Sequence, residues 1–254
     1  MPVERSSYVV RHVAKMPGMT IAGVREAIES RKLKAEKVGP CLSAIACKAH
    51  NYRAAHRLLL RRFTDFLFDK LTGMDTSKTV RHEQLEFDAD RGHHYAASSW
   101  FKLFDLHRIL RDIAISEDDV FIDFGSGKGR VLFVAAHYGF RKVIGVELSA
   151  KLNQIASRNI AKNQHRLVCK DVELVTVDAA QYDIPDDVTV AYFYNPFGGH
   201  VFSDVVDRIR ASLVRNPRDF RLIYVNPVMH DYLIHSGFRV VRKVRHSTLY
   251  TMAT

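Results

Sequence analysis

The chain has 254 residues, of which 47% are hydrophobic and 26% are charged, as in an ordinary globular protein. No apolar run approaches the ~20 residues that cross a bilayer, and the first thirty residues lack the apolar core of a secretory signal, so we expect a cytoplasmic protein. The three cysteines are odd in number and dispersed, which indicates a reducing compartment and argues against a structural zinc site.

The formal net charge of +10 is concentrated at the front of the chain. Residues 1–80 hold 15 Lys and Arg against 7 Asp and Glu, a net +8, whereas the other 174 residues hold 23 against 21, a net +2. A change of charge balance of this kind is a signal of domain organisation. We therefore predict a basic N-terminal extension over 1–80 and a nearly neutral domain over 81–254.

The extension is expected to be helical. A short basic helix is predicted over 20–37, and from Leu42 to Leu71 apolar residues recur at steps of three and four, with Gly73 just beyond, which predicts a long amphipathic helix. Packing of the apolar stripe on the protein's own core is the favoured interpretation, and a dock for an acidic partner (nucleic acid, an anionic membrane or an acidic protein) is the alternative. The polar face of this helix carries Lys48, Arg53, Arg57, Arg61 and Arg62.

Residues 75–94 read as a polar loop, followed by an amphipathic helix over 98–113. The adjacent histidines His93 and His94 cannot easily ligate one ion, and no Cys, His or carboxylate spacing supports them. No metal site is therefore predicted.

The next stretch has the pattern of a strand, a turn, a helix and a second strand. Residues 120–124 form a short apolar run that reads as a buried parallel strand, and three glycines at alternate positions follow it. The helix is expected over 130–138, and the second strand, over 142–146, is followed by Glu147. An acidic residue in that place can accept both hydroxyls of a ribose. The sequence therefore predicts a nucleotide-type site at the carboxyl edge of a parallel sheet.

The spacing of the glycines discriminates among ligands. A phosphate-binding P-loop needs glycine at position 122 and Ser or Thr at position 129, where Ile122 and Gly129 stand. A dinucleotide fingerprint needs glycine at position 130, where Arg130 stands, which weakens that interpretation without excluding it. A strand–helix–strand unit whose glycines serve only packing is the remaining alternative.

The rest of the chain alternates helices and strands, and the last two strands are separated by a short basic turn, so we expect them to form an antiparallel hairpin. The expected helices span 149–162, 200–213 and 229–235, and the expected strands span 172–177, 188–194, 220–225, 238–243 and 248–252. We predict an α/β fold with a Rossmann-like, seven-stranded, mostly parallel sheet.

An acidic residue two positions before G-x-G-x-G, as in Asp123 to Gly129, resembles motif I of class I S-adenosylmethionine (SAM) methyltransferases, and the seven strands with a terminal hairpin are similar to that family's arrangement. The resemblance covers roughly residues 93–254 and implies SAM as the cofactor. It implies that Asp123 faces the amino group of SAM, that Glu147 binds the ribose, and that Asp178 and Ala179 hold the adenine. The implied cofactor-binding residues are Asp123, Gly125, Ser126, Gly127, Gly129, Glu147, Asp178 and Ala179.

Asn195-Pro196-Phe197 stands where motif IV of this family faces the methyl group, so these three residues are the candidate catalytic residues. The string resembles the N-P-P-[FYW] box of amino-methylating enzymes, without the second proline. It also resembles small bacterial methyltransferases distantly similar to non-SET histone lysine methyltransferases, whose D-x-G-S-G-x-G-R motif matches residues 123–130. A plain turn is the alternative, because Asn-Pro commonly starts turns.

The resemblance implies methyl transfer to an amine, in a protein lysine or a small molecule. An apolar aromatic slot would favour the neutral amine, and Tyr192, Tyr194, Phe197 and Tyr224 are the candidates for lining it. Two alternatives stay open: a nucleic-acid methyltransferase that grips phosphates with its basic front segment, and a catalytically silent SAM-binding module.

Overall fold

The computed structural model describes residues 63–78, 80, 100–194 and 197–252. Of residues 100–102 it describes the backbone alone. The described residues fall into two compact units, one with 63–77 and 100–101 and the other with 78, 80 and the residues from 102 onward. Within these residues no helix is long and apolar enough to cross a membrane. The predicted helix over 20–37, the residues His93 and His94, and the pair Asn195-Pro196 lie outside the described residues.

In the first unit, residues 63–72 are helical, and the helix stops before Gly73, which has a φ of 67°. The hydroxyl of Thr72 donates to the carbonyl of Phe68 at 2.7 Å, within the last turn. The carboxylate of Asp69 accepts the backbone amide of Thr76 at 2.9 Å and so holds the chain that leaves the helix. The predicted end of the long amphipathic helix is thus confirmed, and its part before residue 63 lies outside the described residues.

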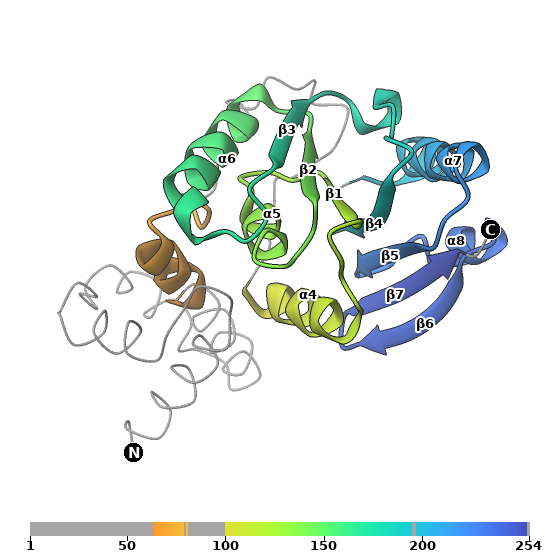
Figure 1. Ribbon diagram of the computed structural model, residues 1–254, viewed down its shortest axis with the longest axis horizontal. Helices are drawn as coiled ribbons and strands as arrows, with labels where there is room; N and C mark the ends of the chain where they lie inside the picture. Colours follow the sequence, from red (N-terminus) through yellow and green to blue (C-terminus); the bar gives the residue numbers. More distant parts are fainter. Residues whose placement is uncertain (1–62, 79, 81–99, 195–196, 253–254) are drawn as a thin grey trace, which may run out of the picture. The chain divides into compact units, whose positions relative to one another are not determined.

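The second unit is built on a seven-stranded sheet in the order β3-β2-β1-β4-β5-β7-β6 (Figure 1). Strands β1 to β5 are parallel to one another, and β7 is antiparallel to both β5 and β6. The predicted mostly parallel sheet with a terminal hairpin is therefore confirmed. The strands are β1 (Val120–Phe124), β2 (Lys142–Glu147), β3 (Val172–Thr176), β4 (Val188–Phe193), β5 (Phe220–Val225), β6 (Arg239–Val244) and β7 (Ser247–Met252).

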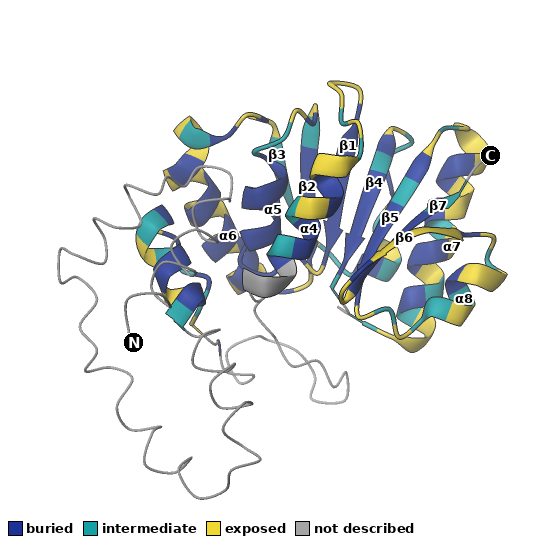
Figure 2. Ribbon diagram, turned by 90° about the horizontal axis from the view of Figure 1, so that it is seen from below, coloured by how far each residue is buried: buried dark blue, intermediate teal, exposed yellow. Residues whose placement is uncertain are grey.

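Helices cover both faces of the sheet (Figures 1 and 2). Alternate residues of β1 share one apolar core with α7 and α8. On the opposite face Gly145 of β2 lies against Leu132 of α5, and Asp112 of α4 contacts Arg242 of β6. The helices are α4 (Trp100–Asp112), α5 (Arg130–Ala135), α6 (Ala150–Asn163), α7 (Gly199–Arg215) and α8 (His230–His235), with short 3₁₀ helices η4 (Gln164–Arg166) and η5 (Ala179–Gln181).

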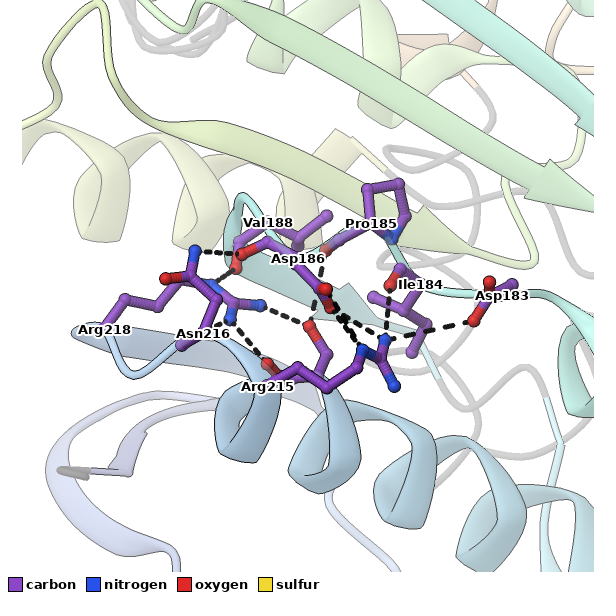
Figure 3. A network of polar contacts seen from close by, with 9 residues as sticks. Asp183, Ile184, Pro185, Asp186, Val188, Arg215, Asn216 and Arg218 are labelled. Carbon is purple, nitrogen blue, oxygen red and sulfur yellow. Dashed lines mark hydrogen bonds and ion pairs between the residues drawn. The ribbon is translucent and has the colours of Figure 1, made fainter.

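A polar network fastens the C-terminal end of α7 to the loop that precedes β4 (Figure 3). Arg215 donates from Nε to the two carboxylate oxygens of Asp186 at 2.9 and 3.0 Å, and the side-chain amide of Asn216 donates to the carbonyl of Asp186 at 2.7 Å. Arg218 donates from Nε to the carbonyl of Val188 at 2.7 Å. Arg218 also donates to the carbonyls of Ser212 and Asn216 and to the Ser212 hydroxyl.

Replacement of Arg218 with alanine is expected to lower the free energy of unfolding by about 2 kcal/mol, because a half-buried guanidinium that serves four acceptors would be lost. Urea unfolding measures the change. The control is Arg210→Ala, which removes only an exposed ion pair with Asp207 at 3.4 Å and should cost less than about 0.5 kcal/mol. Equal effects of the two substitutions would contradict the structural role of Arg218.

Candidate functional site

The candidate site lies where the strand order reverses, at the carboxyl ends of β1 and β4, the usual ligand position in open α/β sheets. The turn after β1 is left-handed at three alternate residues, with φ of 79°, 55° and 80° at Gly125, Gly127 and Gly129. Only glycine adopts these angles without strain. The backbone amides of Gly125 and Ser126 donate to the carbonyl of Val146 at 2.8 and 3.1 Å, so the turn crosses the end of β2.

Glu147 ties this turn to the start of α6. The side chain is 7% exposed. Its Oε2 accepts the backbone amide of Gly127 at 2.8 Å, and its Oε1 accepts that of Ser149 at 2.9 Å. Burial raises the pKa of Glu147, and the backbone amides of Ser149, Gly127 and Leu148 oppose that rise. Each carboxylate oxygen keeps a second lone pair, so Glu147 retains the capacity to accept a diol.

Asp178 and Ala179 follow β3, next to the end of β2. The Asp178 carboxylate accepts the backbone amide of Ala180 at 3.0 Å and caps η5, which is the ordinary role of an Asp after a strand. The amide of Val177 donates to the carbonyl of Glu147 at 3.1 Å, which holds the two strand ends together. The structure thus brings the predicted residues of three strand ends to one sheet edge, and their contact with a cofactor stays a prediction.

Gly145, in the middle of β2, was not among the predicted site residues. A Cβ atom at this position would lie 2.5 Å from Cδ1 of Leu132 and 2.9 Å from Oγ of Ser126. The glycine therefore lets α5 and the glycine turn pack directly on the sheet. A glycine inside a strand is a known sign of such a close approach, and the sequence offered that signal.

Replacement of Gly145 with alanine is expected to destabilise the fold by about 1–3 kcal/mol, because the added methyl group overpacks the contact with Leu132. Thermal and urea unfolding test this. Gly139→Ala is the matched control, since a Cβ atom there would meet nothing within 4 Å. A Gly145→Ala protein as stable as the Gly139→Ala protein would show that the turn has room to shift.

A buried polar cluster lies beside the turn. Asp123 is 2% exposed, and burial and the charge of Glu147 raise its pKa well above the usual range. Tyr192 is the neighbour of Asp123 on β4 and is fully buried, and its hydroxyl has no hydrogen-bond partner within the described part of the chain. Burial first, then the charges of Asp123, Tyr194 and Asp105, raise the pKa of Tyr192, so it stays a neutral phenol.

Asp105 of α4 is the third member of this cluster, and the sequence did not single it out. It is fully buried, and among the described residues neither carboxylate oxygen has a partner with hydrogen-bond geometry. Burial raises its pKa, and the backbone amide of His246 and the charges of Arg245, His246 and Arg108 oppose the rise. Two buried carboxyl groups beside a phenol favour protonated or cation-bound states.

The predicted aromatic slot is wrong as a set of four rings. Tyr192 pairs with Ile223, so it points to the opposite face of the sheet from Tyr224, the next residue of β5. Tyr224 belongs to the core under α7, where its ring centroid lies 5.4 Å from that of Phe202. Period-two alternation forbids both tyrosines from lining one slot.

The candidate catalytic motif follows β4. Its first two residues, Asn195 and Pro196, lie outside the described residues. The third, Phe197, is half-buried, and its ring stands edge-on to that of Phe193 with centroids 6.0 Å apart. The last residue of the motif thus packs against the apolar core at the carboxyl edge of the sheet. Within the described residues no group of three or more His, Cys, Asp or Glu could hold a metal ion.

Comparison with known proteins agrees with this geometry. Residues 102–190 match the model of the family described as histone methylation protein DOT1. A protein-lysine N-methyltransferase from Saccharolobus islandicus is 30% identical over 89 residues, which are 35% of this chain and 53% of that protein. The chain thus spans about half the length of this curated relative.

Solved structures to which the chain is similar include an RNA methyltransferase and a putative RNA methyltransferase. One, from Salinibacter ruber in complex with S-adenosyl-L-homocysteine (SAH), is 24% identical with a TM-score of 0.42 and covers 59% of this chain and 89% of its own. The other, a putative one from Pyrococcus horikoshii, is 15% identical with a TM-score of 0.48 and covers 70% of this chain and 95% of its own. Over residues 102–190 the second unit is thus similar to methyltransferases, and the strand order of its seven-stranded sheet is consistent with that likeness.

Proposed function

We propose that the protein transfers a methyl group from SAM to an amine, and that the acceptor is a lysine side chain of a protein. The observation that carries the cofactor assignment is Glu147, a buried carboxylate that keeps one lone pair on each oxygen. It stands beside three left-handed glycines that present backbone without Cβ atoms. These residues fit a ribose and the methionine chain that follows it.

The roles of the other residues belong to this proposal. Asp123 would face the amino group of SAM, where its buried carboxyl gains an opposite charge that offsets the cost of its burial. Asp178 and Ala179 would hold the adenine, since they follow β3 beside Glu147. The peptide groups of Gly125, Ser126, Gly127 and Gly129 would line the methionine chain.

When bound, SAM supplies an electrophilic methyl group on a sulfonium. The protein's task is then to align the acceptor at ~3 Å and to exclude water. A lysine has a pKa of ~10.4, so its ammonium must lose a proton before the nitrogen lone pair can attack. The half-buried ring of Phe197 would disfavour the ammonium, and the amide of Asn195 would hold the neutral amine.

The choice of lysine rests on the match to the DOT1 family and to the protein-lysine N-methyltransferase from Saccharolobus islandicus. Nucleic acid is the competing acceptor, favoured by the net charge of +10 and by the likeness of Asn195-Pro196-Phe197 to an amino-methylating box. Incubation with radiolabelled SAM and a lysate that is then fractionated should place the label in protein, on lysine. Label in RNA or DNA would overturn the choice of acceptor, and binding of SAM without any turnover would identify a silent binding module.

The proposal includes a basic extension over 1–80 that binds an acidic partner. Its support is the sequence alone, which places +8 of the net charge there. Charge reversal at Arg57, Arg61 and Arg62 is expected to raise KM for the protein substrate and to flatten its salt dependence, while the melting temperature changes little. Unchanged kinetics would instead assign these arginines to a solvated helix face.

A further inference from the structure

The nearly neutral second unit carries its charges unevenly. Residues 232–254 contain four basic residues and no acidic residue. The four are Arg239, Arg242 and Lys243 on β6 and Arg245 in the turn that follows, and all four are exposed. Since β6 is the edge strand of the sheet, this charge faces solvent along one whole border of the domain.

A β-bulge turns two of these arginines to the same side. Arg239 pairs with Thr251 and Arg242 with Leu249, and the register shifts between Val240 and Arg242. Cross-strand partners share a face, and residues two apart on β7 share a face as well. Without the extra residue, Arg239 and Arg242 would point to opposite sides.

That side is the one covered by α4. The guanidinium of Arg242 contacts the carboxylate of Asp112 at the C-terminal end of α4. In the turn after β6, the charges of Arg245 and His246 act on Asp105 of α4 and oppose the rise of its pKa. Helix α4 therefore contacts β6 through Asp112 and lies near the turn that follows β6.

The exposed face of α4 adds Arg108 and Arg111. We call the five side chains Arg108, Arg111, Arg239, Arg242 and Arg245 the arginine surface. Asp112 is the exposed carboxylate that the structure places against it, and Arg242 and Arg111 already contact it. The surface thus carries five positive charges against one negative charge.

The arginine surface extends to the sheet edge that also carries the candidate site. The turn with Arg245 and His246 joins β6 to β7, whose first residue, Ser247, pairs with Val225 at the end of β5. The backbone amide of Asn226, just after β5, donates to the carbonyl of His246 at 2.8 Å. The turn with Arg245 therefore lies at the carboxyl edge of the sheet, beside the end of β5, which is two strands from β1.

We propose that the arginine surface binds the phosphate backbone of a nucleic acid. Arginine offers phosphate a planar pair of donors, and five arginines on two rigid elements present them in fixed positions. The exposed large apolar side chains on β6 are Val240 and Val241, and no exposed Phe, Tyr or Trp accompanies the arginines within the described residues of the second unit. Protein interfaces are centred on apolar and aromatic side chains, whereas phosphate binding needs the charge alone. This inference goes beyond methyl transfer and does not depend on it.

The test compares two double charge reversals in the full chain. Arg108→Glu with Arg239→Glu alters the arginine surface, and Arg158→Glu with Arg210→Glu alters exposed arginines of α6 and α7. The two double variants change the net charge by the same amount, and both contain the basic residues 1–80. The probes are a fluorescein-labelled single-stranded RNA of about 20 nucleotides and a DNA duplex of about the same length, titrated at several salt concentrations.

The first variant is expected to bind the probes at least tenfold more weakly, with a salt slope shallower by roughly 1.4 to 1.8, because each lost phosphate contact contributes about 0.7 to 0.9. The second variant should bind within about twofold of the unaltered protein. Equal weakening of both variants, absence of probe binding by the unaltered protein, or stronger competition by polyglutamate than by RNA would each overturn the proposal. SAH affinity should be the same in all three proteins, which verifies that the domain is folded.

Discussion

Replacement of Glu147 with alanine is expected to weaken the binding of SAM and SAH by roughly 30- to 150-fold, the equivalent of about 2–3 kcal/mol. The carboxylate would make charge-assisted hydrogen bonds to the ribose, and it already fixes the backbone amides of Gly127 and Ser149. Its loss therefore removes ligand contacts and loosens the glycine turn at once. Isothermal calorimetry with SAH measures the affinity directly.

Two further substitutions separate these roles. Glu147→Gln keeps the shape and one acceptor oxygen, so we expect a smaller loss of affinity with an unchanged melting temperature. Glu173→Ala on β3 removes a partly exposed carboxylate that pairs with Lys142 at 2.6 Å, and it should leave SAH affinity within about twofold. Unchanged SAH affinity in Glu147→Ala would contradict the assignment of Glu147 to the cofactor.

The parts of the site that sequence could predict are local. Asp123, the three glycines and Glu147 lie within 25 residues, and a strand, turn, helix and strand of this length fold in only a few ways. The helix expected over 149–162 is confirmed as α6, and Ser149 caps it, because its hydroxyl accepts the backbone amide of Leu152 at 3.2 Å. The terminal hairpin could be predicted because a short turn connects two segments that both have a strand pattern.

The parts that sequence could not predict depend on contacts between distant segments. Asp105 and Tyr192 are 87 positions apart, and only the packing of α4 on the sheet buries them together. The aromatic slot failed because strand boundaries do not tell which face a given tyrosine takes until register is known. The shared side of Arg239 and Arg242 likewise depends on a bulge, which has no clear signal in the string of residues.

Replacement of Asn195 with alanine is expected to lower kcat by about 100-fold or more, because the acceptor amine would lose the amide that positions it for attack. SAH affinity should change by less than about threefold, since the motif follows β4, and the cofactor residues follow β1, β2 and β3. Single-turnover kinetics with radiolabelled SAM measure the chemical step apart from binding.

Asn226 offers a matched control for this experiment. It starts a second Asn-Pro pair after the neighbouring strand β5, and it is exposed. Because its φ is 50°, Asn226→Gly removes the side-chain amide without backbone strain. We expect this variant to keep kcat within about threefold, because the proposed acceptor role belongs to the pair after β4. Equal losses of kcat and SAH affinity in Asn195→Ala would place Asn195 in the cofactor pocket and withdraw its role at the acceptor. A large loss of kcat in Asn226→Gly alone would move that role to the end of β5, where the backbone amide of Asn226 donates to the carbonyl of His246 in the turn that carries Arg245.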